Sequence, residues 1–266
     1  MFTTNPFSIL AETVPPIALQ SFVIVMVALV IIGTLVDIIH KKNVQYFFEN
    51  AKKAKLSATK TLSAGEKISV ISKTIVSDIA TTSELGAGKR RVAHLLGMYG
   101  TILFWTGSVI MIFCYSSPSS DTPSYWPIIW HVGAIMTVVG GSWFWFFLRV
   151  DVYSEAHPWY RIIKADLFVL ALIASSLFGL IWSCLQSLNL NDRWDDKAFL
   201  VLYIISNLAL FGGVYWSKFA HMFYKPGASI QKNLAEADGS RDNLPPPADA
   251  PEQYGLGIDR EKAKHY

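Results

Sequence analysis

Two histidines in separate apolar segments are the residues of this chain that are best suited to do chemistry. His94 lies near the start of the apolar segment 92–115, and His221 closes the apolar segment 198–221. If the two segments are antiparallel membrane helices, both imidazoles lie at the same depth. Ionisable groups are costly inside a membrane, and paired imidazoles are a typical ligand set of a b-type haem. The pattern predicts one haem b bound by His94 and His221, with a hydrogen-bonded structural role or proton handling as the alternatives.

Cations lie one helical turn from each of these histidines. Arg90 and Arg91 precede His94, and Lys218 precedes His221. Carboxylates beside lipid need charged partners, so these side chains are candidates to pair with the two haem propionates. They could equally be interfacial residues whose charged ends reach toward water.

Small residues in the same segments would allow a flat macrocycle to approach closely. Gly97 follows His94 by one turn, and Gly213 precedes His221 by about two turns. We assign both to the candidate haem site. The alternative is ordinary helix–helix packing, where small residues are enriched in membranes.

Three further polar residues are candidates for a quinone site. His131 lies near the outer end of the apolar segment 127–148, and His157 and Tyr160 lie in the loop that follows it. Each histidine could contact a quinone or carry a proton, although a structural role is favoured for both. No further histidine occurs in the segments that carry His94 and His221, so we expect one haem and not two.

Composition places the chain in a membrane. Of its 266 residues, 52% are hydrophobic and 16% are charged, which excludes an ordinary soluble domain. Apolar segments of about 20 residues can cross a hydrocarbon core as helices. We therefore predict an all-α integral membrane bundle of five helices, near residues 17–39, 92–115, 127–148, 167–190 and 198–221.

Charge asymmetry predicts the orientation of the bundle. The first 16 residues contain no Lys or Arg, whereas the segment 40–91 contains eleven. Cationic loops stay on the cytoplasmic side, so the N-terminus is expected outside and the C-terminus in the cytoplasm. The expected location is the inner (cytoplasmic) membrane, as a multi-pass protein, and the small net charge of +3 gives no reason to expect a nucleic-acid partner.

Four parts follow along the chain. Residues 1–39 hold the N-terminal segment and the first helix, and 40–91 form a cytoplasmic amphipathic connector. Residues 92–226 form a four-helix membrane core with the haem site, and 227–266 form a cytoplasmic tail that is either disordered or docks a partner.

Two stretches of the sequence resemble a known family. IVSDIATTSELGAGKRRVAHLLGMYG and SKFAHMFYKP, together with the five-helix layout, are similar to membrane cytochrome b subunits of the nitrate-reductase gamma type. The likeness covers about residues 65–226. It implies that His94 and His221, on the second and fifth spans, ligate the haem nearest the cytoplasm. It also implies that the subunit passes electrons between quinone and a cytoplasmic partner.

The chain departs from the two-haem members of that family because it lacks a second histidine pair. Its size, its single pair and its ending YGLGIDREKAKHY look most like the membrane anchor associated with adenylylsulfate reductase. That resemblance implies a soluble flavin and iron–sulfur enzyme, docked on the inner face, as the partner in sulfur metabolism.

The expected function is therefore that of a non-catalytic anchor and electron-transfer subunit with one haem b, working between the quinone pool and a cytoplasmic iron–sulfur flavoprotein. One alternative is a cofactor-free scaffold that recruits a soluble enzyme to the membrane. A small proton-coupled transporter using His94, His131 and His221 is the other. It is disfavoured because the middle turns of the spans hold little polar chemistry beyond Ser, Thr and Asn207.

Overall fold

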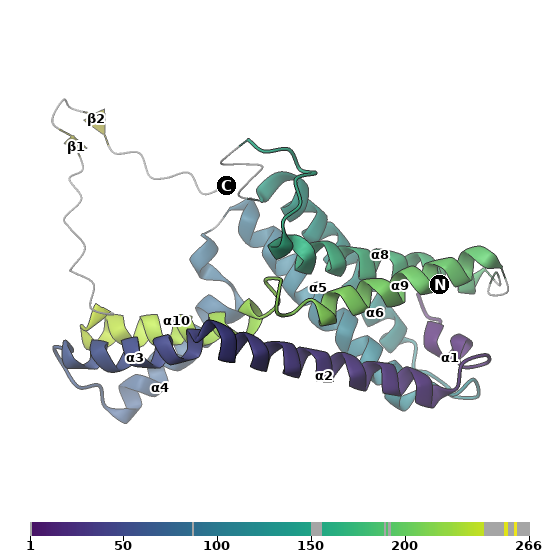
Figure 1. The fold of residues 1–266 in the computed structure, drawn as a ribbon, viewed down its shortest axis with the longest axis horizontal. Coiled ribbons are helices and arrows are strands. Elements are labelled where there is room, and N and C mark those ends of the chain that lie inside the picture. The colour runs from purple at the N-terminus through teal and green to yellow at the C-terminus, as the bar shows by residue number, and fades with distance from the viewer. Residues whose placement is uncertain are drawn as a thin grey trace. The chain divides into compact units, whose positions relative to one another are not determined.

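The computed structural model describes residues 2–86, 88–149, 156–188, 190, 193–241, 253–254 and 258–259. This part of the chain is helical apart from two short strands, β1 (Gln253–Tyr254) and β2 (Ile258–Asp259), which pair antiparallel (Figure 1). The chain divides into two compact units. The membrane unit comprises residues 1–39 and 92–220, and the second unit comprises residues 40–91 and 221–266.

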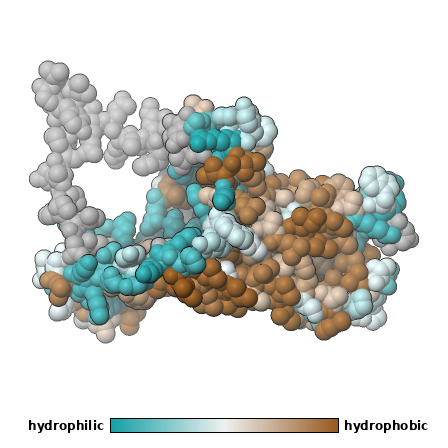
Figure 2. Space-filling view, viewed as in Figure 1, coloured by the Kyte–Doolittle hydropathy of each residue, from teal (hydrophilic) through white to brown (hydrophobic). Residues whose placement is uncertain are grey.

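The membrane unit is built from long apolar helices (Figure 1). Four helical stretches are long and apolar enough to cross a membrane: Pro16–Lys41, Lys89–Cys114, Tyr125–Leu148 and Lys164–Ser187. The elements are α1 (Pro6–Leu10), α2 (Pro16–Lys41), α5 (Lys89–Cys114), α6 (Tyr125–Trp143) with the π-helical turn η3 (Phe144–Leu148), η4 (Lys164–Asp166), α8 (Leu167–Ser187) and α9 (Trp194–Gly212). Figure 2 shows a mostly apolar surface over this unit, as expected for helices that face lipid. These helices mark the chain as a multi-pass membrane protein.

The fifth apolar segment differs from the expectation of one helix over 198–221. Helix α9 begins earlier, at Trp194, and ends at Gly212, so it carries Asp195, Asp196 and Lys197 in its first turn and is not among the four stretches. The chain then turns through residues 213–220, and His221 begins the next helix, α10 (His221–Asp238).

Glycine explains where α9 stops. Glycine lowers helix stability relative to alanine, and two glycines follow each other at this point of the chain. A Cβ added at Gly213 would lie 2.5 Å from the carbonyl oxygen of Ala209 and 2.7 Å from a methyl group of Leu167. The site therefore requires glycine because α8 packs directly against the backbone there.

Helices α5 and α6 approach each other backbone to backbone. A Cβ added at Gly133 would lie 2.5 Å from the nitrogen of Phe104, and one at Gly100 would lie 2.6 Å from the nitrogen of Thr137. A Cβ at Gly140 would lie 2.6 Å from the nitrogen of Gly97. Small residues at such positions let membrane helices gain van der Waals contact that larger side chains would prevent.

Replacement of Gly133 by alanine tests this contact. In an exposed helix the change would stabilise by about 1 kcal/mol, because alanine is the better helix former. Here the added methyl group overpacks the helix crossing, and we expect destabilisation by about 1–3 kcal/mol. Thermal unfolding in detergent, followed by circular dichroism, should show a lower Tm for Gly133→Ala. Gly212→Ala is the matched control, since a Cβ there meets nothing within 4 Å. An unchanged or raised Tm for Gly133→Ala would contradict the close approach.

An aromatic core fills the end of the membrane unit near the N-terminus, where the short helix α1 inserts. Phe7 lies between Trp130 and Trp182, with ring centroids 5.9 and 5.7 Å apart. Asn5 caps α1 by accepting from the backbone nitrogen of Phe7, and its amide donates to the carbonyl of Tyr115 at 2.9 Å. The N-terminal residues therefore close this end of the bundle.

The second unit is a small helical assembly with a polar surface on α10 (Figure 2). Its elements are α3 (Asn43–Leu56), α4 (Ala64–Thr74), the π-helical η1 (Ile75–Ala80), η2 (Ser83–Leu85) and α10. Helix α4 begins with a capping box between Ser63 and Glu66. Helix α10 packs against α3, α4 and η1, and its end accepts hydrogen bonds at the carbonyl of Asp238 from the nitrogens of Thr59 and Lys60.

Helix α10 also revises the expected tail. The sequence placed a docking or disordered tail from 227 onward, whereas α10 continues to Asp238 as part of the second unit. Most of the remaining expected tail, including nearly all of YGLGIDREKAKHY, lies outside the described residues.

One carboxylate joins α10 to η1. Asp78 accepts from the hydroxyl of Ser83 at 2.6 Å, from the amide of Asn233 at 2.7 Å and from the hydroxyl of Ser77 at 2.8 Å. Ser229 donates to the same carboxylate at 3.3 Å. Hydrogen bonds to the charged form, from Ser83 first and then Asn233, lower the pKa of Asp78 from 3.8 to about 2.

This network makes the second unit sensitive to acid. Because the folded pKa of Asp78 is depressed, its stabilisation is present above about pH 4 and is lost as the pH falls toward 2. Allowing for solvent screening, we expect a contribution of about 1–2 kcal/mol. Amide hydrogen-exchange protection of α10 at pH 6 should fall about tenfold or more in Asp78→Asn, with a weaker acid dependence. Glu236→Gln, an exposed carboxylate of α10, is the control. Equal protection in wild type and Asp78→Asn would exclude this role.

Candidate functional site

His94 lies within the first two turns of α5 and is half-buried. One turn further on, Gly97 packs its nitrogen against Gly140 of α6, yet a Cβ built on Gly97 meets nothing within 4 Å. Open space therefore lies beside the helix next to His94.

The two arginines that precede His94 have different surroundings. Arg91 donates its Nε to the carbonyl oxygen of Thr81 at 2.7 Å, which ties the start of α5 to the turn after η1. Arg90 is half-buried. The predicted propionate partner Arg91 therefore has a structural contact within the second unit, in which residues 40–91 lie.

An aromatic cluster holds the chain after α9 against α5. Trp105 stacks on Phe219, with ring centroids 6.0 Å apart and planes 14° apart, and it also contacts Phe211. Phe219 is 1% exposed and makes an edge contact with Phe168 of α8. Trp105 follows His94 by eleven residues, about three helical turns, so the two side chains lie on the same face of α5.

The other predicted haem residues take different positions. His221 is exposed, begins α10 and belongs to the second unit, whereas His94 belongs to the membrane unit. Lys218 is exposed in the turn formed by residues 213–220. Gly213 is buried against Leu167, so its small size serves helix packing, which was the alternative noted from the sequence.

His131 is a fully buried structural residue. Its Nδ1 lies 2.7 Å from the carbonyl oxygen of Pro127 and its Nε2 lies 2.8 Å from the hydroxyl of Ser183. A carbonyl only accepts, so Nδ1 carries the proton and Nε2 accepts from Ser183. Because both ring nitrogens are occupied, His131 joins α6 to α8 and offers no group to a quinone.

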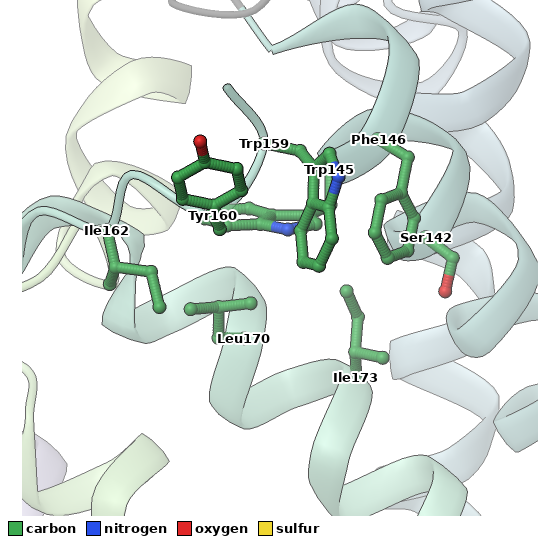
Figure 3. Close-up of a pocket in the computed structure, with 8 residues that line it drawn as sticks. All are labelled: Ser142, Trp145, Phe146, Trp159, Tyr160, Ile162, Leu170 and Ile173. Atoms are coloured by element: carbon green, nitrogen blue, oxygen red, sulfur yellow. The ribbon is translucent and has the colours of Figure 1, made fainter. Parts of the chain in front are cut away.

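Tyr160 lines a cavity of about 240 Å³ at the end of α6, as shown in Figure 3. The cavity is bounded by η3, by the loop that carries Tyr160 and by α8. Its lining consists of Ser142, Trp145, Phe146, Trp159, Tyr160, Ile162, Leu170 and Ile173. His157, which the sequence grouped with Tyr160, is half-buried in the same loop and does not belong to this lining.

A buried ion pair, which sequence reasoning missed, supports this cavity. The Arg149 guanidinium lies 2.8 Å from the Asp166 carboxylate and donates to the carbonyl of Arg161 at 2.6 Å. It also lies 4.2 Å from the ring centre of Trp145. An arginine after an aromatic run and an acidic residue before the next apolar run were the only available signals.

Among the described residues, no group of three or more His, Cys, Asp or Glu side chains is arranged to hold a metal ion. A haem needs only two axial side chains, so this finding does not bear on it. No model of a known protein family, no curated protein and no solved structure matches this chain.

Removal of the His131 imidazole should destabilise the membrane unit. His131→Ala leaves the buried Ser183 hydroxyl without its partner, removes the second donor to the Pro127 carbonyl and opens a space beside Trp130. A buried unsatisfied group costs about 1–3 kcal/mol, so the Tm in detergent should fall by several degrees. Ser187→Ala, which removes an intrahelical hydroxyl contact one turn along α8, is the control. A Tm drop no larger than that of the control would refute the bridging role.

Proposed function

We propose that this chain is a membrane electron-transfer subunit that binds one b-type haem through His94 and His221. It exchanges electrons between membrane quinone and a cytoplasmic iron–sulfur flavoprotein. The protein itself makes and breaks no bonds in a substrate. Its residues bind and orient the haem and recruit the partner.

The stacking of Phe219 on Trp105 is the observation that carries this proposal. Phe219 precedes His221 by two residues, a length of chain that spans at most about 7 Å. Trp105 lies on the face of α5 that also carries His94. The packing therefore holds the chain just before His221 against the helix of the other proposed ligand.

The residues around His94 fit a haem. Imidazole nitrogen is a common axial ligand of haem iron. A Cβ built on Gly97 meets nothing within 4 Å, which leaves this side of α5 open next to His94, and Arg90 in the preceding turn is a cation of the kind that pairs with a propionate. Lys218 provides a second exposed cation three residues before His221.

Ligation by two histidines determines the class of chemistry. When bound, the haem supplies a one-electron carrier whose potential depends on its axial ligands and surroundings. His94 and His221 would both hold the iron, and a haem held by two imidazoles would supply electron transfer and not oxygen or substrate chemistry. Electron transfer is the function that such a site supports.

The proposed topology has five spans, with α9 as the fifth. Its first-turn residues Asp195, Asp196 and Lys197 would lie at the outer surface, and the apolar remainder would cross toward the cytoplasm. The cationic segment 40–91 and α10 would then both face the cytoplasm, in agreement with the positive-inside rule. In this proposal the N-terminus lies outside, and the membrane is the inner (cytoplasmic) membrane.

The second unit is the proposed docking region for the soluble partner. Helix α3 exposes Lys52, Lys53 and Lys55, which could attract an acidic surface. The resemblance to the membrane anchor associated with adenylylsulfate reductase suggests that enzyme, in dissimilatory sulfur metabolism, as the partner.

The structure gives little support to a proton-coupled transporter. The buried hydroxyls of Thr101, Thr137 and Ser175 bond to carbonyls of their own helices. Asn207 donates to the carbonyl of Tyr203 in the same way. These groups do not form a path for protons, and the pairs that do face one another across the bundle, His131 with Ser183 and Ser108 with Trp130, each join only two neighbouring helices.

Difference spectra test the haem proposal. Wild-type protein produced with ample haem should show b-type bands when the dithionite-reduced spectrum is compared with the oxidised one. His94→Ala and His221→Ala should each remove these bands, because loss of either axial ligand opens the iron coordination. His40→Ala is the matched control at the end of α2 and should retain the bands.

Two results would count against the proposal. Full haem content in both His94→Ala and His221→Ala would refute the ligand assignment. Absence of b-type bands from the wild-type protein would select the cofactor-free scaffold. Retention of the native fold in each variant is checked by circular dichroism and gel filtration.

A further inference from the structure

Aromatic rings form several walls of the cavity at the end of α6. Phe146 and Trp159 make an edge contact with ring centroids 5.4 Å apart, and Trp159 and Tyr160 do so at 5.7 Å. Leu170 and Ile173 of α8 form the opposite wall (Figure 3). Flat walls of this kind favour a planar ring, which can stack or make edge contacts on several sides.

The size and polarity of the cavity restrict its occupant further. An apolar cavity of about 150 Å³ can hold benzene, so one of about 240 Å³ accommodates a one- or two-ring group. Only Ser142 and the indole and phenol groups contribute polar atoms to the lining, and Figure 3 shows the Tyr160 hydroxyl pointing away from Leu170 and Ile173. An uncharged, mostly apolar ring matches such a lining, because a charged or strongly polar ligand would lose its hydration without gaining partners.

The outer wall of the cavity is exposed, which indicates a route of entry. Trp159 is 53% exposed, Tyr160 67% and Ile162 64%. Tryptophan and tyrosine are the residues that favour the boundary between lipid and water, and these two lie a few residues before the spanning stretch Lys164–Ser187. A ligand dissolved in the membrane could therefore enter from the bilayer, with an apolar tail left in the lipid.

The inner wall is rigid by comparison. Trp145 is 3% exposed, and Arg149 lies over its ring. The ion pair of Arg149 with Asp166 neutralises the cation and fixes its position, so the wall offers a preorganised surface without net charge.

We propose that this cavity holds the ring of a membrane quinone between Trp145, Trp159 and Leu170. The inference deepens the proposed function, on which it rests for the choice of quinone, and it places the ring in contact with none of the histidines. Contact through stacking, with few hydrogen bonds, predicts modest affinity and tolerance of both one-ring and two-ring quinones. A phospholipid acyl chain is the competing occupant, but an acyl chain cannot stack on the aromatic rings that line the cavity on several sides.

Cavity filling tests the proposal. Menadione and a ubiquinone with one isoprene unit are titrated by calorimetry into the full-length protein in detergent. Leu170→Trp places an indole in the cavity and should weaken binding of both quinones by at least about tenfold. The matched control is Leu177→Trp, at a surface position two turns along α8, which should bind as wild type does.

A second pair of variants removes an aromatic wall without filling the cavity. Trp159→Ala should weaken binding about threefold to tenfold, the range expected for a lost aromatic contact. Trp194→Ala removes a 78% exposed tryptophan at the start of α9 and should have no effect. This pair keeps the test decisive if Leu170→Trp fails to fold.

The outcomes of these experiments distinguish the quinone proposal from the haem proposal. Unchanged quinone binding in Leu170→Trp or Trp159→Ala overturns the quinone proposal, even when the b-type bands are intact. A phospholipid that co-purifies with wild type, is lost in Leu170→Trp and is not displaced by either quinone also overturns it. Absence of b-type bands bears only on the proposed function, because the calorimetric titration does not require haem.

Discussion

Helices α5 and α6 touch through their backbones at Gly100, Gly133 and Gly140, and the rest of the membrane unit is arranged around this contact. In lipid there is little hydrophobic gain from bringing helices together, so close van der Waals packing must hold them. The crossing fixes the rotation of α5. That rotation turns His94 and Trp105 away from α6, toward the side where the chain returns after α9.

Several polar side chains in the membrane unit are paired with groups on the same helix or on a neighbouring one. Ser108 donates to the carbonyl of Phe104 and accepts from the indole of Trp130, and His131 is held between Pro127 and Ser183. Such pairing is required because an unsatisfied group in hydrocarbon is costly. The features left for binding therefore lie toward the ends of the helices: the open space at Gly97 and the aromatic cavity beyond η3.

The two units are stabilised by different kinds of interaction. The membrane unit depends on glycine contacts and on aromatic packing around Phe7, Trp130 and Trp182. The second unit depends on capping and on hydrogen bonds to the single carboxylate of Asp78. The polar surface of α10 in the second unit suits contact with a soluble partner, whereas an apolar unit suits lipid and lipid-soluble ligands. The proposed function needs both.

Much of the architecture could be read from residue patterns, because length and hydropathy alone determine which helices can cross a membrane. The positions of the four spanning stretches, the boundary near residue 91 and the placement of His94 near a helix start follow from local properties. Local patterns did not predict the ion pair of Arg149 with Asp166 or the bridging role of His131. The residues that form each of these contacts lie far apart in the sequence. The end of α9 at Gly212 was also missed, because the pair Gly212 and Gly213 stops the helix inside a segment that remains largely apolar. Local composition therefore determined which segments could span a membrane, and tertiary packing decided where helices stop, which histidine is structural and where a ligand could fit.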